Sequence, residues 1–384
     1  MTQGFIHSTF RHFLLFILLT TAANNSKSLA KMDDKHNPEL NVMELIKKYY
    51  LPIFLCLSLL GNSLSVCVLF CTKLRYKSSS IYLGALAMSD TGMLVITFIQ
   101  WFVVMKIITV DYWLLVLLNG SIYLFSFLSV WIVVVFTVQR YIVVQWPLLC
   151  CSLCTVTRAK NIVIGLAGLA VLLSIPVFIL LYIIYTNSDA DEEEMFHWSK
   201  ISYFNDTIIN DTIITTYLPA TIPSFIMLNI SYTILYVDEN LMYWWWILSI
   251  IDAIITCFLP ATTIVIFNVL IVYNIRKQNR IRKDMISSFF ASNKNTQSSD
   301  NEASHIEVTK MLVIISTLFI CLNVPTYVVD LCDYYGICGT YCVIIEYIVE
   351  LLWLANCGIN VVLYCATGKN FRKELIRMFT KFRY

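Results

Sequence analysis

One aspartate lies in the middle of a long apolar run, where a charged side chain is costly. Asp90 ends the stretch LGALAMSD and is the only charged residue between Ser78 and Met105. A carboxylate at the centre of a membrane helix costs about 2.5–3.5 kcal/mol on insertion scales, so such residues face the bundle interior and serve a function. We therefore expect Asp90 to contact polar side chains of neighbouring helices rather than lipid.

Polar residues of three other apolar runs are candidate partners of Asp90. Asn62 lies in the stretch GNSLS, Ser129 lies in the third run, and Asn356 and Asn360 share one helical face because they are four residues apart. That face continues in steps of three and four through Glu346, Glu350, Trp353, Asn356, Asn360 and Tyr364. We expect one inward polar face; the alternative is that these amides only join helices to each other, with about 0.6 kcal/mol per contact.

These residues lie on segments whose composition predicts a membrane environment. Of 384 residues, 58% are hydrophobic and 14% are charged, whereas soluble domains have about 45–50% apolar and about 25% charged residues. Seven segments have at most one charge each, namely Tyr49–Thr72, Ser78–Met105, Tyr112–Gln139, Asn161–Ser188, Asn240–Ile275, Met311–Val329 and Leu351–Gly368. Each is near or above the roughly 20 apolar residues that a spanning helix needs. We predict an all-α membrane protein, with a seven-transmembrane helix bundle over residues 49–367.

The first residues differ from the seven spans. A short apolar run, FLLFILLTTAA, follows Arg11 and His12 and ends in small residues, as a cleaved signal peptide does. We predict a signal peptide over residues 1–23 and an extracellular segment over residues 24–48. An uncleaved N-terminal segment is the alternative, and both imply an N-terminus outside the cell.

Basic residues near the span ends predict the side of the membrane that each loop occupies. Lys and Arg cluster after spans one, three and five and in the tail, and by the positive-inside rule these parts are cytoplasmic. The segment 276–305 is then a cytoplasmic loop. The segment 187–240 has nine acidic residues, one lysine and three N-x-S/T sequons, at Asn205, Asn210 and Asn229. Glycan acceptor sites favour the extracellular side, so we expect a glycosylated multi-pass protein of the plasma membrane.

The chain after the seventh span predicts a helix on the membrane surface. In KNFRKELIRMF, Phe371, Leu375 and Phe379 recur every four residues, with basic residues around them. This pattern is typical of an amphipathic helix on the anionic inner leaflet, and we assign a cytoplasmic helix and tail to residues 368–384. The alternative is a solvated helix with a chance apolar stripe.

Several short motifs occur along the chain in order. They are GN in span one, LAMSD in span two, QRY at the end of span three, FLP in span five, FICLNVP in span six, and NCGINVVLY followed by TGKNFRKEL at span seven. Together they resemble the rhodopsin-like (class A) G-protein-coupled receptors over about residues 49–380. By position, the resemblance implies that the family's span landmarks are Asn62, Asp90, Arg140, Pro260, Pro325, Asn360 and Tyr364.

The resemblance implies an interior ion and a cytoplasmic partner. The family's sodium-ion site matches Asp90, Ser129, Asn356 and Asn360, and a carboxylate with hydroxyl and amide oxygens suits a small hard cation. A heterotrimeric G protein would bind at the cytoplasmic ends of the helices. The positions implied in activation and G-protein coupling are Gln139, Arg140, Tyr141, Asn323, Pro325, Asn360 and Tyr364.

The chain departs from the family's pattern at several positions. Asn323 replaces the aromatic residue of span six, Val361 replaces the proline of span seven, and Asn268 replaces a tyrosine below Pro260. Leu115 stands where the family has a cysteine bonded to the long outer loop, and residues 187–240 contain no cysteine. The pose of that loop over a ligand is therefore open.

The residue before Arg140 is also a departure, because the family has an acid where this chain has Gln139. An acid would be a charged partner for the arginine, whereas glutamine offers neutral hydrogen bonds that are roughly half as strong. Our hypothesis is a looser resting lock on Arg140 and higher basal signalling.

Acidic residues near the outer ends of the spans predict the chemistry of the ligand. Ile122 and Leu354 stand where amine receptors hold an aspartate and opsins a retinal lysine, so neither ligand class is expected. Around an outward-facing cavity we expect Gln100, Trp101, Tyr123, Asp252, Asp330, Glu346, Glu350 and Trp353. Carboxylates attract cations and bind arginine bidentately, which favours a basic peptide as the ligand, as in invertebrate receptors of FMRFamide type. The alternative is that the acids pair with Lys106 or with water.

Cysteine placement predicts one disulfide. The chain has thirteen cysteines, an odd number, so at least one is free. Cys332 and Cys338 flank the short outer loop between spans six and seven, on an oxidising side where a bridge can form. On the cytoplasmic side, the cysteines at 150, 151 and 154 are either palmitoylated or plain thiols.

The residues together predict a receptor for an extracellular basic neuropeptide that signals to a G protein. No catalytic-triad spacing, phosphate loop or metal motif occurs, so we expect no enzyme activity, no nucleic-acid partner and no cofactor besides the interior sodium ion. Two alternatives stay open. One is a receptor that binds without signalling, because of Asn323 and Val361, and the other is a transporter or channel, although no internal repeat is found.

Overall fold

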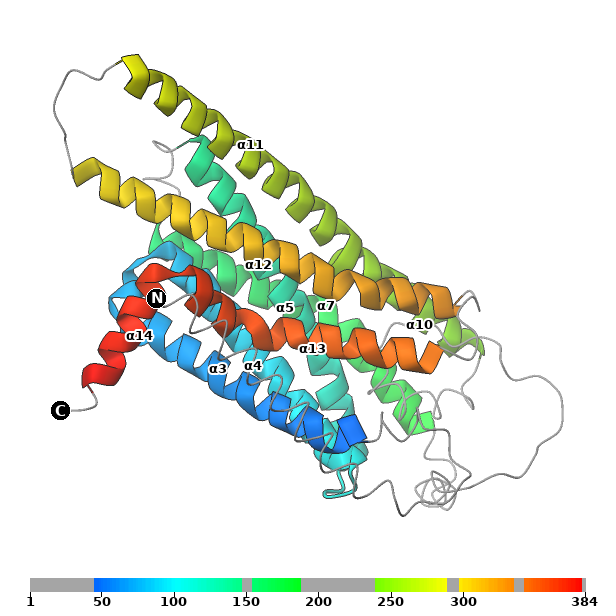
Figure 1. Ribbon diagram of the computed structural model, residues 1–384. Coiled ribbons are helices and arrows are strands. Elements are labelled where there is room, and N and C mark those ends of the chain that lie inside the picture. The colour runs from blue at the N-terminus through cyan, green and yellow to red at the C-terminus, as the bar shows by residue number, and fades with distance from the viewer. Residues whose placement is uncertain (1–44, 147–153, 188–238, 289–296, 335–341, 382–384) are drawn as a thin grey trace, which may run out of the picture.

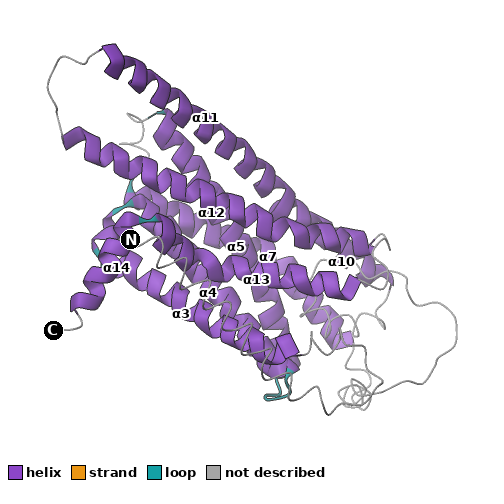
Figure 2. Ribbon diagram, in the orientation of Figure 1, coloured by secondary structure: helices purple, strands orange, loops and turns teal. Residues whose placement is uncertain are grey.

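The computed structural model describes residues 45–146, 154–187, 239–288, 297–334 and 342–381. Within these residues the chain forms helices joined by short turns, and it contains no strand (Figure 2). Seven helices are long and apolar enough to cross a membrane. The structure therefore confirms the predicted all-α, seven-helix bundle.

The seven spans follow one another along the chain (Figure 1). In order they are η2 with α3 (Ile46–Tyr50 and Leu51–Cys71), α4 (Ser78–Val104), α5 (Tyr112–Gln145), α7 (Val156–Asn187), α10 with η5 and α11 (Glu239–Asp252, Ala253–Phe258 and Leu259–Ser288), α12 (Gln297–Tyr334) and α13 (Cys342–Thr367). A short 3-10 turn, η3 (Lys73–Tyr76), joins the first two spans, and α14 (Lys369–Lys381) follows the last.

The spans pack around α5, which contacts α4, α7, α11 and α12, while α13 packs between α3 and α12. Buried apolar side chains form two clusters along the bundle. One lies toward the end away from α14, hereafter the far end, and includes Leu94 and Trp353. The other lies toward the α14 end and includes Phe136 and Leu312. Along α4 and α13, Asp90 and Asn360 lie between the residues of the first apolar cluster and those of the second. These two polar residues therefore separate the two apolar clusters.

Glycines allow α3 and α13 to approach closely. A Cβ added at Gly61 would lie 2.6 Å from the Cγ1 atom of Val361, and one at Gly358 would overlap Ser58. Small residues at such positions let membrane helices pack backbone to backbone. Val361, at the position where the resemblance predicts a proline, thus fills the space that Gly61 leaves open.

The fifth span has an irregular turn next to a proline. The chain forms a π-helical turn, η5, directly before α11, in which each N–H bonds to the carbonyl five residues back. Pro260 has no N–H, so the carbonyl of Ile255, five residues earlier, is available to another donor. The indole Nε1 of Trp131 on α5 donates to it at 3.2 Å, which joins the third and fifth spans.

The segment 276–305, which we expected to be a loop, is largely helical. Helix α11 continues to Ser288 and α12 begins at Gln297, so both extend beyond the rest of the bundle at the α14 end (Figure 1). Arg276, Lys277 and Arg280 are exposed there. Arginine, lysine and glutamine are good helix formers, so the helix continues past the apolar part of the span.

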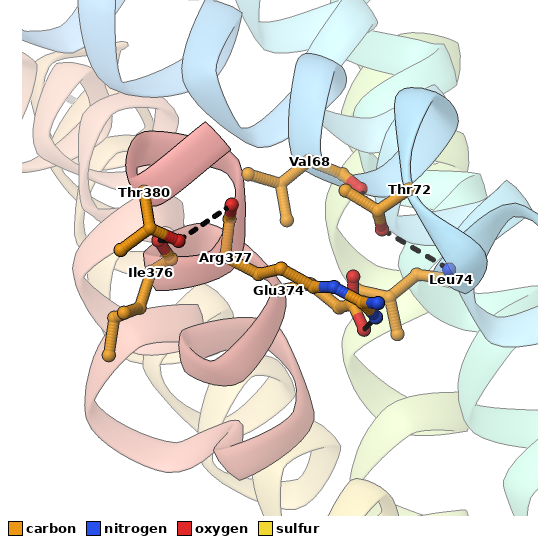
Figure 3. Close-up of polar contacts among 7 residues, drawn as sticks. All are labelled: Val68, Thr72, Leu74, Glu374, Ile376, Arg377 and Thr380. Atoms are coloured by element: carbon orange, nitrogen blue, oxygen red, sulfur yellow. Dashed lines mark hydrogen bonds and ion pairs between the residues drawn. The ribbon is translucent and has the colours of Figure 1, made fainter. Parts of the chain in front are cut away.

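The predicted amphipathic helix after span seven is confirmed as α14. Its buried residue is Phe371, whose ring contacts that of Tyr364 with 5.6 Å between centroids, whereas Phe379 is exposed. The guanidinium of Arg372 donates to the carbonyls of Cys365 and Ala366, at 2.9 Å each. It thus provides hydrogen-bond donors to backbone carbonyls in the last turn of α13, where such carbonyls have no partner within the helix. Figure 3 shows α14 beside the end of α3 and η3, with the Glu374–Arg377 ion pair at 3.8 Å.

Candidate functional site

The Asp90 carboxylate joins three helices by hydrogen bonds. The side chain is 1% exposed. Ser129 Oγ on α5 donates to its Oδ1 atom at 2.9 Å, and Asn360 Nδ2 on α13 donates to its Oδ2 atom. The structure thus brings together three of the four residues of the ion site that the resemblance implies, namely Asp90 on α4, Ser129 on α5 and Asn360 on α13.

Two further amides lie near this cluster but have different contacts. Asn356 is buried one turn from Asn360 on the same face of α13. Asn62 is fully buried, and its Nδ2 atom donates to the carbonyl of Cys357 at 2.8 Å. The Oδ1 atom of Asn62 has no hydrogen-bond partner among the described residues. The groups that do meet at Asp90 are a carboxylate, the Ser129 hydroxyl and the Asn360 side-chain amide, and oxygen atoms of these kinds suit a small hard cation.

Arg140, at the α14 end of α5, is almost completely buried, with 2% of its surface exposed. Its guanidinium donates to Ser79 Oγ on α4 and, at 3.4 Å, to the Oε1 atom of Gln139. It also lies over the ring of Phe136, with 5.0 Å to the centroid. Both of these acceptors are neutral oxygens.

Gln139 makes a second link to the first turn of α4. Its Nε2 atom donates to Ser78 Oγ at 3.3 Å, and the ring of Phe136 one turn earlier stacks on Tyr82 at 5.6 Å. Sequence reasoning did not identify the two serines as partners of Arg140. The available signal was the run SSS at the predicted start of span two, at the same membrane surface as the end of span three.

The next aromatic residue, Tyr141, faces the fifth span. Its ring contacts Phe267 of α11 edge-on, with 5.2 Å between centroids. About three turns of α11 further from the bundle centre, Gln278 Nε2 donates to the carbonyl of Val144 at 2.8 Å. The third and fifth spans are therefore joined at the α14 end as well as at η5.

A reciprocal hydrogen-bond pair joins the fifth and sixth spans. Asn268 Nδ2 donates to Ser316 Oγ at 2.8 Å, and Ser316 Oγ is 3.1 Å from Asn268 Oδ1. Both side chains are buried. Asn268 stands where the resemblance predicts a tyrosine, so the departure replaces a phenol with an amide that binds the neighbouring helix directly.

Two sixth-span residues of the activation set lie close together on α12. Asn323 is buried, and its Nδ2 atom donates to the carbonyl of Phe319 in its own helix at 2.9 Å. Pro325 lies inside the helix, and Thr326 Oγ1 donates to the carbonyl of Val349 on α13 at 3.3 Å.

Tyr364, the last residue of the activation set, lies on α13. It is 1% exposed, and its hydroxyl has no hydrogen-bond partner among the described residues.

The described part of the inward face of α13 matches the prediction. Glu350, Trp353, Asn356, Asn360 and Tyr364 are all buried. The spacing of three and four residues therefore identified one helical face correctly. This face extends from the far end of the bundle, at Glu350, to the α14 end, at Tyr364.

The polar residues expected at the far end fall into two groups. Gln100 Nε2 on α4 donates to Asn119 Oδ1 on α5 at 3.0 Å, and the Gln100 Oε1 atom has no partner among the described residues. Trp101 points instead to the first span, where its Nε1 atom donates to the carbonyl of Lys47 at 2.8 Å. Tyr123 is partly buried on α5.

Asp252 lies at the end of α10 and is partly exposed. Thr256 Oγ1 is 3.3 Å from the Oδ2 atom of Asp252 and 2.6 Å from the carbonyl oxygen of Asp252. The same Oγ1 atom is 2.8 Å from the hydroxyl of Tyr327 on α12. This threonine was not expected at the site, and it connects the acid of the fifth span to the sixth.

Several predicted residues lie outside the described part of the chain. Residues 1–44 include the predicted signal peptide, and residues 188–238 include Asn205, Asn210 and Asn229. The side chains of Asp330, Cys332 and Glu346 and the whole of Cys338 are also outside it.

The chain matches no protein-family model, and no curated protein matches it.

Proposed function

We propose that this chain is a rhodopsin-like G-protein-coupled receptor of the plasma membrane. In this proposal the N-terminus and the acidic segment 187–240 are extracellular, with glycans on Asn205, Asn210 and Asn229. The ligand is an extracellular, basic neuropeptide, as for receptors of FMRFamide type. A heterotrimeric G protein binds at the α14 end, which is then cytoplasmic.

The observation that carries the proposal is the buried guanidinium of Arg140. A charge this deeply buried at a helix end is costly and needs a use. Two of its acceptors, Ser79 and Gln139, are neutral, and a hydrogen bond to a neutral oxygen is lost at a lower cost than one to a carboxylate. Such a group suits a two-state bundle in which ligand binding shifts the populations of the two states.

The Asp90 cluster would transmit the change between the two ends of the bundle. It connects α4, α5 and α13 between the two apolar clusters. Asp90, Ser129, Asn356 and Asn360 would hold the sodium ion, which when bound neutralises part of the carboxylate charge. Movement of α13 would change the contacts of Asn360 and of Tyr364, four residues further along the same face.

Asn268 and Ser316 would hold the cytoplasmic halves of α11 and α12 together in the resting state. Interhelical hydrogen bonds of this kind contribute about 0.6 kcal/mol on average in membranes. Their loss is therefore a small cost when α12 moves to open a crevice for the G protein. Tyr141 and Tyr364 line the same end of the bundle and would contribute to coupling.

The far end would bind the peptide. Glu350 and Trp353 on α13 are buried, and Gln100 on α4 has an acceptor oxygen without a partner among the described residues. A buried carboxylate gains most from a charged, hydrogen-bonded partner, as an arginine side chain supplies. Asp252, Asp330 and Glu346 would add negative charge, and a Cys332–Cys338 disulfide would brace the loop between spans six and seven.

A specific observation also favours a second candidate, a receptor that binds its ligand without activating a G protein. Asn323 replaces the family's aromatic residue and hydrogen-bonds within its own helix, so it offers no ring to a ligand. The third candidate function is that of a transporter or channel, which would produce a flux of ions or solute.

A cell assay tests the proposal. Cells that express the chain are exposed to a library of amidated peptides while calcium and cyclic nucleotides are recorded. The proposal predicts a response to a basic peptide that is lost in Arg140→Ala at equal surface expression. Peptide binding without any response would favour the non-signalling receptor, and ion or solute flux without a G-protein response would refute the proposal.

A further inference from the structure

A lysine at the start of the first span lies over a tyrosine of the seventh. Lys47 belongs to the π-helical turn η2, and its Nζ atom is 5.1 Å from the centroid of the Tyr347 ring. Attraction between an ammonium group and the face of an aromatic ring explains this position. The first and seventh spans are thus joined at the far end by a cation and a ring.

The backbone of Lys47 is held from a third helix. Trp101 Nε1 on α4 donates to the Lys47 carbonyl at 2.8 Å. The indole therefore fixes the residue from which the lysine side chain extends. The ammonium group itself is on a flexible, half-buried side chain near the end of the span, where a lysine can also extend into water.

The tyrosine beneath the lysine has unused hydrogen-bonding capacity. Tyr347 is 4% exposed, and its hydroxyl has no hydrogen-bond partner among the described residues. Glu350 lies one turn further along the same face of α13, is also 4% exposed, and is close enough to interact electrostatically with Tyr347. A buried ring face, a phenolic hydroxyl and a carboxylate together are the groups that recognise a guanidinium.

We propose that Tyr347 and Glu350 form a cation site and that Lys47 is its built-in occupant, which the guanidinium group of a ligand displaces. The inference rests on the proposed function in that it names the residues that would take the basic side chain of the peptide. A guanidinium is planar, is more weakly hydrated than an ammonium, stacks on rings and binds carboxylates bidentately. It therefore replaces lysine at this site, while the released Lys47 side chain enters water.

Lys47 then sets the affinity and the specificity of the site. A ligand with a neutral side chain gains too little to displace the lysine, whereas an arginine side chain gains both the ring and the carboxylate. Removing the lysine charge takes this competitor away from the Tyr347 ring, so a guanidinium binds more tightly.

The test measures binding of a small guanidinium probe to the purified full-length protein. The probe is N-acetylargininamide, and its control is N-acetylcitrullinamide, which has the same shape without the charge. Thermal stability in detergent is followed as each compound is titrated into wild type and into Lys47→Met, Lys47→Arg and Lys48→Met. Lys48 is the matched control because it also lies over a tyrosine, Tyr49, at 5.6 Å.

We expect Lys47→Met to bind the arginine probe at a concentration at least tenfold lower than wild type does. Lys48→Met should behave as wild type, and Lys47→Arg should bind the probe no more tightly than wild type, because a tethered guanidinium occupies the site. Lys47→Met combined with Glu350→Gln should lose the gain. Lys47→Gln is the second variant if Lys47→Met does not fold. Equal half-saturation in wild type and Lys47→Met, no binding to either of them, or equal binding of the citrulline control would overturn the inference.

The outcome can be separated from that of the proposed function. No G protein is present in this measurement, so guanidinium binding in a chain that never activates a G protein would refute the proposed signalling alone. Peptide signalling with the same potency in wild type and in Lys47→Met would refute this inference alone.

Discussion

The guanidinium of Arg140 donates a hydrogen bond to the hydroxyl of Ser79 and so joins the end of α5 to the first turn of α4. Gln139 reaches the adjacent Ser78 at 3.3 Å. The residue that we expected to loosen the arginine therefore makes a link of its own to the same turn. In the proposed receptor, these two serines and Gln139 form part of the resting lock on Arg140.

Removing the hydroxyl from Ser79 should raise basal signalling. Ser79→Ala deletes one acceptor of Arg140, whereas Ser79→Thr keeps a hydroxyl at the same place. A hydrogen bond to a charged group contributes about 1.5–3 kcal/mol, so basal activity should rise several-fold in the alanine variant only. Inositol phosphate or cyclic nucleotide levels without ligand provide the measurement, and equal basal levels in both variants would place the lock elsewhere.

Restoring an acid beside the arginine should have the opposite effect. In Gln139→Asp a carboxylate replaces the neutral oxygen that lies 3.4 Å from the guanidinium, and charge-assisted hydrogen bonds are roughly twice as strong. Basal signalling should fall, by roughly fivefold for a gain of about 1 kcal/mol. Gln139→Asn controls for the shorter side chain, and basal activity that falls equally in both would show that charge is not the cause.

Sodium should stabilise the purified protein through Asp90. The melting temperature should be higher in sodium chloride than in potassium chloride of equal concentration, because the cluster of carboxylate, hydroxyl and amide oxygens suits a small cation. Asp90→Asn should abolish the difference, and Ser129→Ala should reduce it. Asp252→Asn is the matched control, an aspartate of another span, and should retain it. Equal melting temperatures of wild type in the two salts would refute the ion site.

The carboxylate of Glu350 should contribute to the affinity for a basic peptide. Glu350→Gln keeps the shape of the side chain and removes its charge, and we expect at least tenfold lower potency, which corresponds to about 1.4 kcal/mol. Asp111→Asn, an exposed acid at the start of α5 with no side-chain hydrogen bond to its helix, is the control and should leave potency unchanged. Unchanged potency in Glu350→Gln would remove the carboxylate from the ligand site.

The pair Asn268 and Ser316 should be energetically coupled. Ser316→Ala leaves the buried Asn268 amide without this partner, which costs about 1–3 kcal/mol. In Asn268→Leu the Ser316 hydroxyl keeps its bond to the carbonyl of Val313 at 3.3 Å, so the loss is smaller. The double variant removes both groups, so its loss of thermal stability should be smaller than the sum of the single losses. A double-mutant cycle of melting temperatures tests this, and strict additivity would show that the hydrogen bonds contribute nothing.

Residues related by regular spacing could be predicted from the sequence. The seven spans followed from segments with at most one charge each, the inward face of α13 from steps of three and four, and α14 from a period of four. Asp90, Ser129 and Asn360 could be grouped because a buried charge needs polar partners and few polar residues lie at that depth. For these residues local chemistry and periodicity are sufficient.

Contacts between distant parts of the chain could not be predicted in the same way. Ser78 and Ser79 are 61 residues from their partners, and a serine run at a helix start reads as ordinary capping sequence. Lys47 reads as a surface charge, because its position over Tyr347 depends on how the first and seventh spans pack. The hydrogen bond from Trp131 to the carbonyl of Ile255 depends on a π-helical turn. Pro260 permits this turn but does not require it.

The central claim is that the protein catalyses nucleotide exchange on a G protein through Arg140. The most direct measurement uses the purified chain in lipid vesicles with heterotrimeric G proteins and follows the uptake of a non-hydrolysable GTP analogue, with and without the basic peptide found by screening. We predict uptake above the receptor-free background that the peptide increases and that Arg140→Ala reduces to background, with Arg158→Ala, an exposed arginine at the start of α7, as control. Uptake at the receptor-free background for wild type with every G-protein class, or equal uptake by wild type and Arg140→Ala, would contradict the account.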